Sequence, residues 1–222
     1  MKQILRASNY PQLYSLELIN FQAETLYEYL TGVKKLPNLK CLSFTSFHHT
    51  YEYDKAIVPL LRRMINLEEL QLYLFVRKLD ATYIDGYQLY DQFLIYMTQL
   101  KKFTFYIKTE ISFKTVRLEL PTNEDIQRSF IGRRYSQVTS YTCTQSVPFD
   151  GVCHIYSLPY DFEYFVDLNN SFQGGIFKKV RLLKMYDGIP FEHNFFELIS
   201  QDFPFIEFLY ISNSHPQKDN QH

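Results

Sequence analysis

The side chains best suited to metal binding lie between residues 48 and 54. His48 and His49 are followed by Tyr51, Glu52 and Asp54, which adds oxygen ligands to two imidazoles. The spacing differs from H-E-x-x-H, which places two histidines on one face of a helix, and the segment follows an expected strand as a loop would. We therefore interpret it as a solvated loop and expect no bound metal.

A cysteine beside a histidine could pair a nucleophile with a base. Cys153 and His154 are adjacent in an expected strand, where neighbouring side chains point to opposite faces and do not meet. A disulfide between Cys143 and Cys153 is an alternative. Three cysteines at no framework spacing, counting Cys41, favour free thiols in a reduced compartment, the cytoplasm or the nucleus.

Two other motifs carry little chemistry. Gly174-Gly175 lacks the G-x-x-x-x-G-K-[ST] context of a phosphate-binding loop and is typical of a turn. Arg128, Arg133 and Arg134 form a small basic cluster, which is usually a solvated face, although it could contact an acidic partner. We therefore expect no enzyme and no cofactor.

The composition limits the classes of partner. The 222 residues carry a net charge of −1, which gives no electrostatic reason to expect nucleic acid or an anionic membrane. No run of about 18 apolar residues occurs, so we expect no membrane span. Aromatic residues make up 18% of the chain without any Trp, and this predicts a core built on Phe and Tyr as well as Leu.

The elements that position these residues follow from a recurring pattern, L-x-x-L-x-L. One copy is Leu67, Leu70 and Leu72. In a strand, side chains alternate between the two faces, so Leu70 and Leu72 share one face and neighbouring polar residues share the other. Six copies occur, and their first apolar residues are Leu13, Leu39, Leu67, Leu100, Val180 and Ile206.

These starts are 26, 28, 33, 80 and 26 residues apart, close to the roughly 20–29 residues of leucine-rich repeats except where a segment is inserted. Stacked copies would bury a continuous core. The pattern predicts an irregular α/β solenoid over residues 1–213, with a mainly parallel sheet, outer helices, an inserted hairpin, an insertion at about 106–152 and a disordered tail over 214–222.

We expect strands at 103–113, 137–144 and 153–158, the last two as the hairpin. The expected helices cover 24–30, 55–64, 87–97, 161–168 and 191–201, and Thr122 begins another.

The copies resemble leucine-rich repeats of the long, helix-containing kind. The Asn or Cys usual after the third apolar position is absent, which implies irregular loops. Later segments, including the runs DIQRSFIGRRY at 125–135 and NSFQGGIF at 170–177, resemble one large group of proteins with an F-box followed by such repeats. In that family the F-box binds a ubiquitin-ligase adaptor and the repeats hold the substrate. No F-box-like segment precedes the first repeat here, so an adaptor is expected only if an F-box exists upstream.

The strand phase predicts one concave face, which we expect to bind a protein partner of unknown identity. Its aromatic side chains would be the anchors, because Tyr and Phe dominate protein interfaces. The alternative is that loops or the inserted hairpin bury them. The candidate partner-binding residues are Glu69, Gln71, Tyr73, Lys102, Thr104, Tyr106, Lys184, Tyr186 and Tyr210.

These observations favour a non-enzymatic protein-binding module, with substrate recognition in ubiquitin ligation as its implied context. One alternative is a truncated or decayed F-box relative that folds without adaptor binding. A hydrolase is the distant alternative, because no motif supplies a nucleophile with its base.

Overall fold

A computed structural model describes residues 10–21, 36, 38–80, 82–111, 120–135, 137–143 and 151–214. The strands are β1 (Ser15–Ile19), β2 (Cys41–Thr50), β3 (Glu69–Lys78), β4 (Lys102–Ile111), β5 (Val138–Cys143), β6 (Gly151–Ser157), β7 (Tyr164–Leu168), β8 (Leu182–Asp187) and β9 (Phe208–Asn213). The helical segments are η1 (Tyr53–Ile57), α3 (Val58–Arg63), α4 (Gly86–Gln92), η2 (Leu94–Tyr96), α5 (Asn123–Arg128) and α6 (His193–Asp202).

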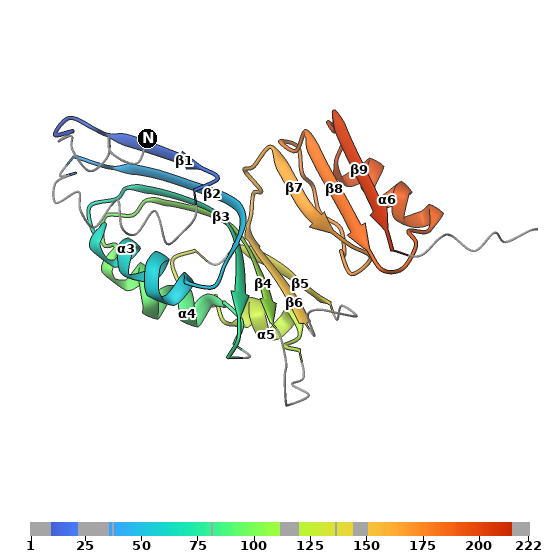
Figure 1. Ribbon diagram of the computed structural model, residues 1–222, viewed down its shortest axis with the longest axis horizontal. Coiled ribbons are helices and arrows are strands. Elements are labelled where there is room, and N and C mark those ends of the chain that lie inside the picture. The colour runs from blue at the N-terminus through green and yellow to red at the C-terminus, as the bar shows by residue number, and fades with distance from the viewer. Residues whose placement is uncertain are drawn as a thin grey trace, which may run out of the picture.

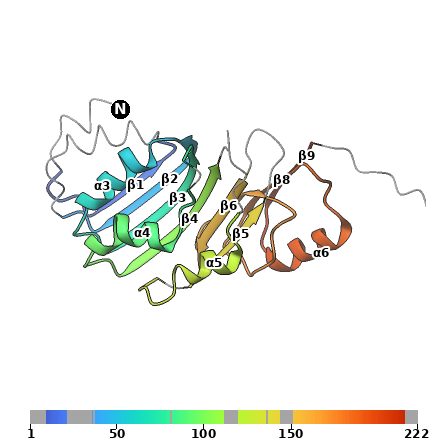
Figure 2. The ribbon, with the colours of Figure 1, turned by 90° about the horizontal axis from the view of Figure 1, so that it is seen from below.

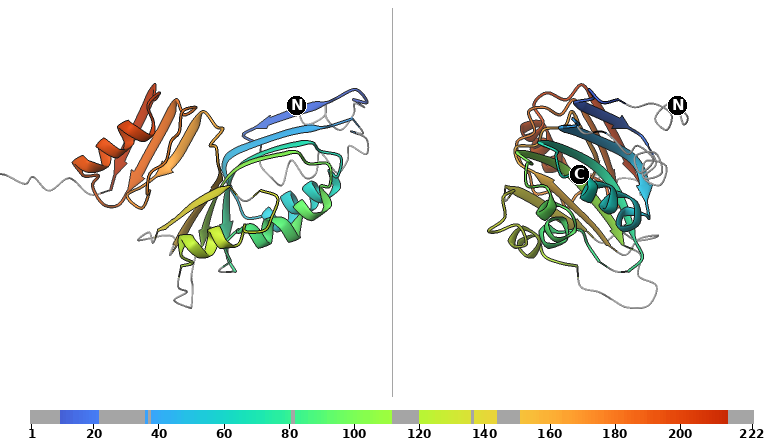
Figure 3. Two further views of the ribbon diagram at one scale, coloured as in Figure 1. Left: turned by 180° about the vertical axis from the view of Figure 1, so that it is seen from behind. Right: turned by 90° about the vertical axis from the view of Figure 1, so that its left-hand side faces the viewer.

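The strands form two sheets, of six and of three strands (Figure 1). The larger has the order β1-β2-β3-β4-β6-β5, and the smaller has the order β7-β8-β9. Helices α3, α4 and α5 lie on one face of the larger sheet, whereas α6 belongs to the smaller (Figure 2). The two sheets stand at an angle to each other, as the view from behind shows (Figure 3).

The first four copies of the repeat pair as predicted. Strands β1 to β4 are parallel, and Leu16, Leu42, Leu70 and Phe103 lie opposite one another in a single row. The same turn precedes each later strand: the carbonyl of Lys40 accepts hydrogen bonds from the backbone N–H groups of Glu68 and Glu69, and that of Glu68 accepts from the next pair. The repeated sequence therefore does produce a repeated local structure.

The prediction of one solenoid with a mainly parallel sheet is wrong. After β4 the chain returns, and β6 pairs antiparallel with β4 and then with β5. The hairpin thus occupies the edge where the next parallel strand would have joined, so the fifth and sixth copies form a separate sheet. The unpaired edge of β4 can form hydrogen bonds with any strand placed beside it. An antiparallel strand can do so without the helical crossover that a parallel strand requires.

Residues 161–168 were expected to form a helix, and this prediction is also wrong. They contain β7, which pairs in parallel with β8 and places Phe165 opposite Leu183. Phe162 and Phe165 have the spacing of Leu67 and Leu70, so β7 is an aromatic version of the same unit. Because Phe stands at both positions in place of Leu, the L-x-x-L-x-L pattern does not include this copy.

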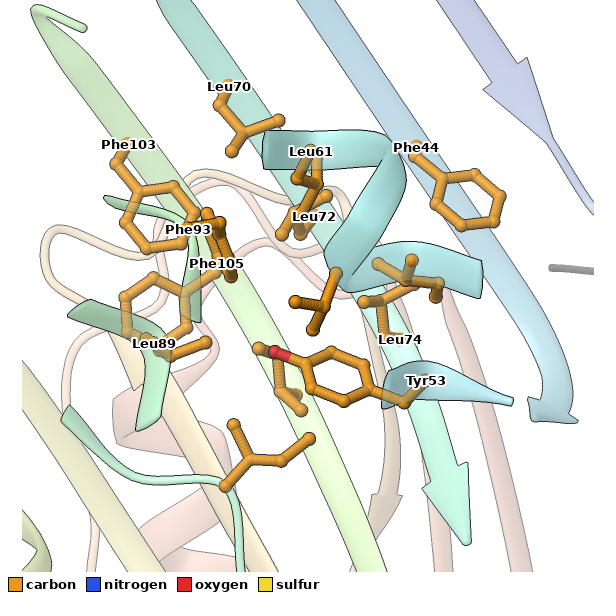
Figure 4. Packing of buried hydrophobic residues seen from close by; sticks show 14 of the residues in the cluster. Phe44, Tyr53, Leu61, Leu70, Leu72, Leu74, Leu89, Phe93, Phe103 and Phe105 are labelled. Atoms are coloured by element: carbon orange, nitrogen blue, oxygen red, sulfur yellow. The ribbon is translucent and has the colours of Figure 1, made fainter. Parts of the chain in front are cut away.

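One core lies between the helices and the larger sheet (Figure 4). Leu70 and Leu72 of β3 are buried against Leu61 of α3 and Phe93, as the alternation predicted. Tyr96, within the helix expected at 87–97, is 48% exposed in the three-residue η2 that follows α4. The described part of the chain contains no helix with the length and apolarity needed to cross a membrane.

The helix boundaries show which local signals were correct. Thr122 and Asp125 form a capping box at the start of α5, as expected from the Thr and the acids that follow it. Pro59 lies in the first turn of α3, where its missing N–H is tolerated. Asp54 does not cap this helix. It instead forms an ion pair with Lys78 of β3.

A second core joins the two sheets, and it is strongly aromatic. It contains Tyr73, Tyr106 and Tyr156 from the larger sheet and Phe165 and Phe203 from the smaller part. Phe177 stacks on Phe203 with ring centroids 4.5 Å apart. The high Phe and Tyr content predicted from composition is therefore concentrated at this junction. The expected helix at 24–30, the hairpin turn at 144–150 and the tail after residue 214 lie outside the described residues.

Candidate functional site

The structure divides the nine predicted partner-binding residues into two groups. On the larger sheet, Glu69 and Lys102 are exposed and Gln71 is half-buried. Tyr73, Thr104 and Tyr106 are buried, and Tyr73 and Tyr106 have no exposed surface at all. On the smaller sheet, the three predicted residues are exposed: Lys184, Tyr186 and Tyr210.

The prediction that Tyr73 and Tyr106 line an exposed face is wrong, because the free edge of β7 rests on them. The Tyr73 hydroxyl accepts a hydrogen bond from the N–H of Val166 at 3.2 Å. The Tyr106 hydroxyl donates to the carbonyl of Val166 at 2.9 Å. These two stacked tyrosines satisfy backbone groups that a neighbouring strand would otherwise satisfy. They are docking residues within the chain and not a surface for a partner.

The same contact defines the protonation of His154. Tyr106 uses its proton for Val166, so its 2.7 Å hydrogen bond with Nδ1 of His154 is donated by the imidazole. Nε2 is then an unprotonated acceptor, and it has no partner among the described residues. Burial, with the nearby Lys108 cation, holds the pKa of His154 well below its usual range. The ring is therefore neutral, and it stacks on Tyr141 with the two ring centroids 4.2 Å apart.

A charged cluster lies beyond the tyrosines on the same face of β4. The carboxylate of Glu110 accepts hydrogen bonds from Nε2 of His49 at 3.0 Å, Nε of Arg77 at 2.8 Å and Nζ of Lys108 at 2.7 Å. Lys108 also contacts Asp167 of β7 at 2.8 Å. The residue pairing predicts this arrangement, since Arg77 lies opposite Glu110 in adjacent strands.

The charges of this cluster balance one another. Burial by itself would raise the pKa of Glu110, but the hydrogen bonds from His49, Lys108 and Arg77 outweigh it and hold that pKa below its usual range. Burial opposes the charge of Lys108, and the two carboxylates overcome this and raise its pKa. Both groups are charged at neutral pH, so ion pairs in the cluster hold β4 and β7 together. The cluster therefore offers no free base or acid.

The three cysteines are free, and Cys143 and Cys153 are protonated. Burial raises the pKa of Cys143 to about 11 and that of Cys153 further still, so neither thiol supplies a thiolate at neutral pH. Cys153 packs in the core beneath the helices, whereas His154 faces the second sheet. The prediction that the two point to opposite faces is confirmed, and Cys153-His154 cannot operate as a nucleophile and base.

The histidine loop forms no metal site in the part of the chain that the structure describes. No group of three or more His, Cys, Asp or Glu side chains there is arranged to hold a metal ion. His49 belongs to β2 and contacts Glu110, so it is part of the charged cluster. The interpretation of the segment as a solvated loop is wrong for His48 and His49, because β2 continues through both of them and pairs His49 with Phe75 of β3 after a shift in register.

One face of β8 and β9, here called the β8–β9 face, carries three exposed aromatic side chains. Tyr186 is 45%, Phe208 55% and Tyr210 54% exposed. Lys184 lies opposite Tyr210 in the neighbouring strand, with its ammonium 5.4 Å from the ring centroid. The β8–β9 face consists of Leu182, Lys184, Tyr186, Phe208, Tyr210 and Ser212, all of which alternate with buried or α6-facing residues.

This face includes three of the nine predicted residues, and the alternation within β8 and β9 was sufficient to find it. The tyrosine hydroxyls that hold β7 and the cluster around Glu110 were missed. Alternating charged residues in β4, Lys108 and Glu110, were the signal, because two charges on the face of a central strand require partners. Comparisons with protein-family models, with curated proteins and with solved structures found no match to the chain.

Proposed function

We propose that the chain is a non-enzymatic protein-binding module and that the β8–β9 face binds the partner. The observation that carries the proposal is the exposure of Tyr186, Phe208 and Tyr210 on one face of a regular sheet. Monomeric proteins seldom expose contiguous aromatic surface without use. Tyr is favoured at interfaces because it buries a large ring while its hydroxyl finds a hydrogen-bond partner.

The chemistry of the face defines the kind of partner. Lys184 has no ion pair with a carboxylate among the described residues, and it lies beside the aromatic rings. A partner that presents an apolar segment flanked by a carboxylate would complement both features. The pairing of β9 with β8 also fixes the backbone that carries these side chains, so little backbone conformational entropy is lost on binding.

The cellular context we propose is the cytoplasm or nucleus, where three free thiols stay reduced. Substrate recognition in ubiquitin ligation is part of the same proposal. Its support is the resemblance of the chain to F-box proteins. A truncated or decayed relative without adaptor binding is the second reading of that resemblance. Co-purification of a ligase adaptor with the gene product, as expressed in its own cell, separates the two.

The binding surface is tested by quantitative affinity capture with matched tyrosine variants. Tyr186→Ala and Tyr210→Ala remove rings from the β8–β9 face, and Tyr96→Ala removes a ring of similar exposure next to α4. We expect the wild type and Tyr96→Ala to capture the same proteins in similar amounts. The amount captured by each of the two face variants should be lower by about tenfold or more, since anchor truncation costs about 2 kcal/mol. Equal capture by all variants, with each shown to be folded, would contradict the proposal.

A further inference from the structure

Strand β9 is the outer edge of the smaller sheet and lies on the side away from the larger one (Figures 1 and 3). Its other edge pairs with β8. All six of its residues are exposed, including Leu209 at 46% and Ile211 at 47% on the face opposite Tyr210. Among the described residues, no segment covers either face completely or pairs with the outer edge.

The direction of the backbone groups follows from the pairing with β8. The N–H groups of Phe208 and Ser214 donate to the carbonyls of Arg181 and Asp187 in and next to β8. Because successive residues of a strand direct these groups to opposite edges, Leu209 and Ile211 direct theirs outward. The outer edge therefore presents a row of unpaired donors and acceptors between apolar side chains.

Edge strands are usually protected by a lysine, a proline, a bulge or a covering segment. Strand β9, with the sequence FLYISN, contains no charge and no proline, and its pairing with β8 runs without a bulge. Among the described residues, none of these protections is present. An identical uncharged edge would meet it without like-charge repulsion.

We propose that β9 pairs antiparallel with β9 of a second copy of this chain, about a twofold axis that passes between the two Tyr210 residues. This register places Leu209 of one copy opposite Ile211 of the other, and their outward backbone groups form the hydrogen bonds. Tyr210 lies opposite Tyr210 in the pair without hydrogen bonds, where side chains approach most closely. Apolar side chains meet on both faces, and twofold symmetry closes the assembly at a dimer.

The area is sufficient for a weak, concentration-dependent dimer. At about 200 Å² for an aromatic side chain, the exposed halves of Phe208 and Tyr210 alone bury about 200 Å² in each copy. With Leu209, Ile211 and the strand backbone, we expect the two copies together to bury about 1,000 Å², which is the lower limit for a specific interface. The joined sheet would also place two β8–β9 faces side by side. The proposal goes beyond the proposed function and does not depend on it.

Sedimentation equilibrium of the purified chain, over the micromolar range, tests the dimer without any other partner. Ile211→Lys places a charge on the edge, and Ile211→Pro removes an outward N–H without removing a bond to β8. We expect both to raise the dimer dissociation constant by about tenfold or more. Ile131→Lys, at a residue 69% exposed after α5, is the matched control and should associate like the wild type. Circular dichroism confirms that each variant is folded.

Disulfide trapping tests the register. Tyr210→Cys places two thiols on Cα atoms about 4.5 Å apart, within the range for a disulfide, and should give a covalent dimer on mild oxidation. Ser212→Cys places the two thiols about 14 Å apart along the strands and, like the wild type with its three native thiols, should not. A wild type that stays monomeric, unchanged association of both Ile211 variants, or no trapping through Tyr210→Cys would each overturn the proposal.

Discussion

At the scale of single residues, two tyrosine hydroxyls determine how the sheets meet. Tyr73 accepts a hydrogen bond from the N–H of Val166, and Tyr106 donates one to its carbonyl, at the free edge of β7. In a chain built from repeated strands this edge would be an attachment point for another strand. The hydroxyls remove that possibility and bury the polar groups without loss of hydrogen bonds.

Tyr106→Phe should lower the free energy of unfolding by about 1–3 kcal/mol, because it leaves the Val166 carbonyl and Nδ1–H of His154 without a partner in a buried site. Urea unfolding of the variant and the wild type measures the difference. The control is Tyr186→Phe, whose hydroxyl is exposed next to Ser214 and whose loss should stay within about 0.5 kcal/mol. Equal losses would contradict the role of Tyr106.

Glu110 makes stability depend on pH. Because its pKa is held below the ordinary value of 4.5, the folded state keeps the carboxylate charged at a pH where the unfolded state takes up a proton. Its contribution is present above pH 4.5 and is lost as the pH falls further. Glu110→Gln should lower stability at pH 7 by about 3 kcal/mol, because it breaks a buried ion pair.

Urea unfolding at pH 7 and at several values below pH 4.5 measures both effects. We expect the difference between the wild type and Glu110→Gln to become smaller as the pH falls. Glu69→Gln, at an exposed position of β3, is the control and should change little at any pH. A difference between wild type and Glu110→Gln that stays constant with pH would show that the charge of Glu110 is not responsible.

At the scale of elements, each repeated strand presents one apolar face to the helices. In β3 the alternation places Leu70 and Leu72 in the helix-facing core and Gln71 on the other face, where Ser43 donates a hydrogen bond to it. On the opposite face, the aromatic residues Tyr73 and Tyr106 are buried against the segment that contains β7. The phase of the strand therefore determines which substitutions the chain tolerates.

Leu70→Ala should lower the free energy of unfolding by about 2–5 kcal/mol, since it leaves a cavity in a packed core. Gln71→Ala removes one half-buried acceptor and should cost about 1 kcal/mol or less. Chemical denaturation of both variants gives the comparison. If Gln71→Ala proved as destabilising as Leu70→Ala, the assigned phase of β3 would be incorrect.

At the scale of the whole molecule, the aromatic core couples the two sheets. Phe165 of β7 is fully buried. On one side its ring contacts Tyr106 and Tyr156 of the larger sheet. On the other side it contacts Phe177 and Phe203, which precede β8 and β9. Among the described strands, none pairs across the two sheets, and the chain passes from one sheet to the other between β6 and β7. We therefore expect packing at this residue to make the two sheets unfold as one cooperative unit.

Phe165→Ala should cost about 3–5 kcal/mol and should loosen both sheets together. Hydrogen exchange followed by mass spectrometry measures this, with peptides from β3 and β8 as reporters. We expect exchange to accelerate in both. If β8 exchanged faster while β3 kept the protection of the wild type, the sheets would unfold independently and the shared core would not couple them.

The sequence alone determined the local units: the strands of the repeat, their inward leucines, the capped start of α5 and the exposed positions Lys184, Tyr186 and Tyr210. Each depends on spacing within a few residues, which the chain carries directly. Only the tertiary structure decided that β6 pairs with β4, that β7 replaces an expected helix and that Tyr73 and Tyr106 are buried. Alternation predicts that two residues share a face, but whether that face is covered depends on a segment distant in sequence, here Val166, 93 residues after Tyr73.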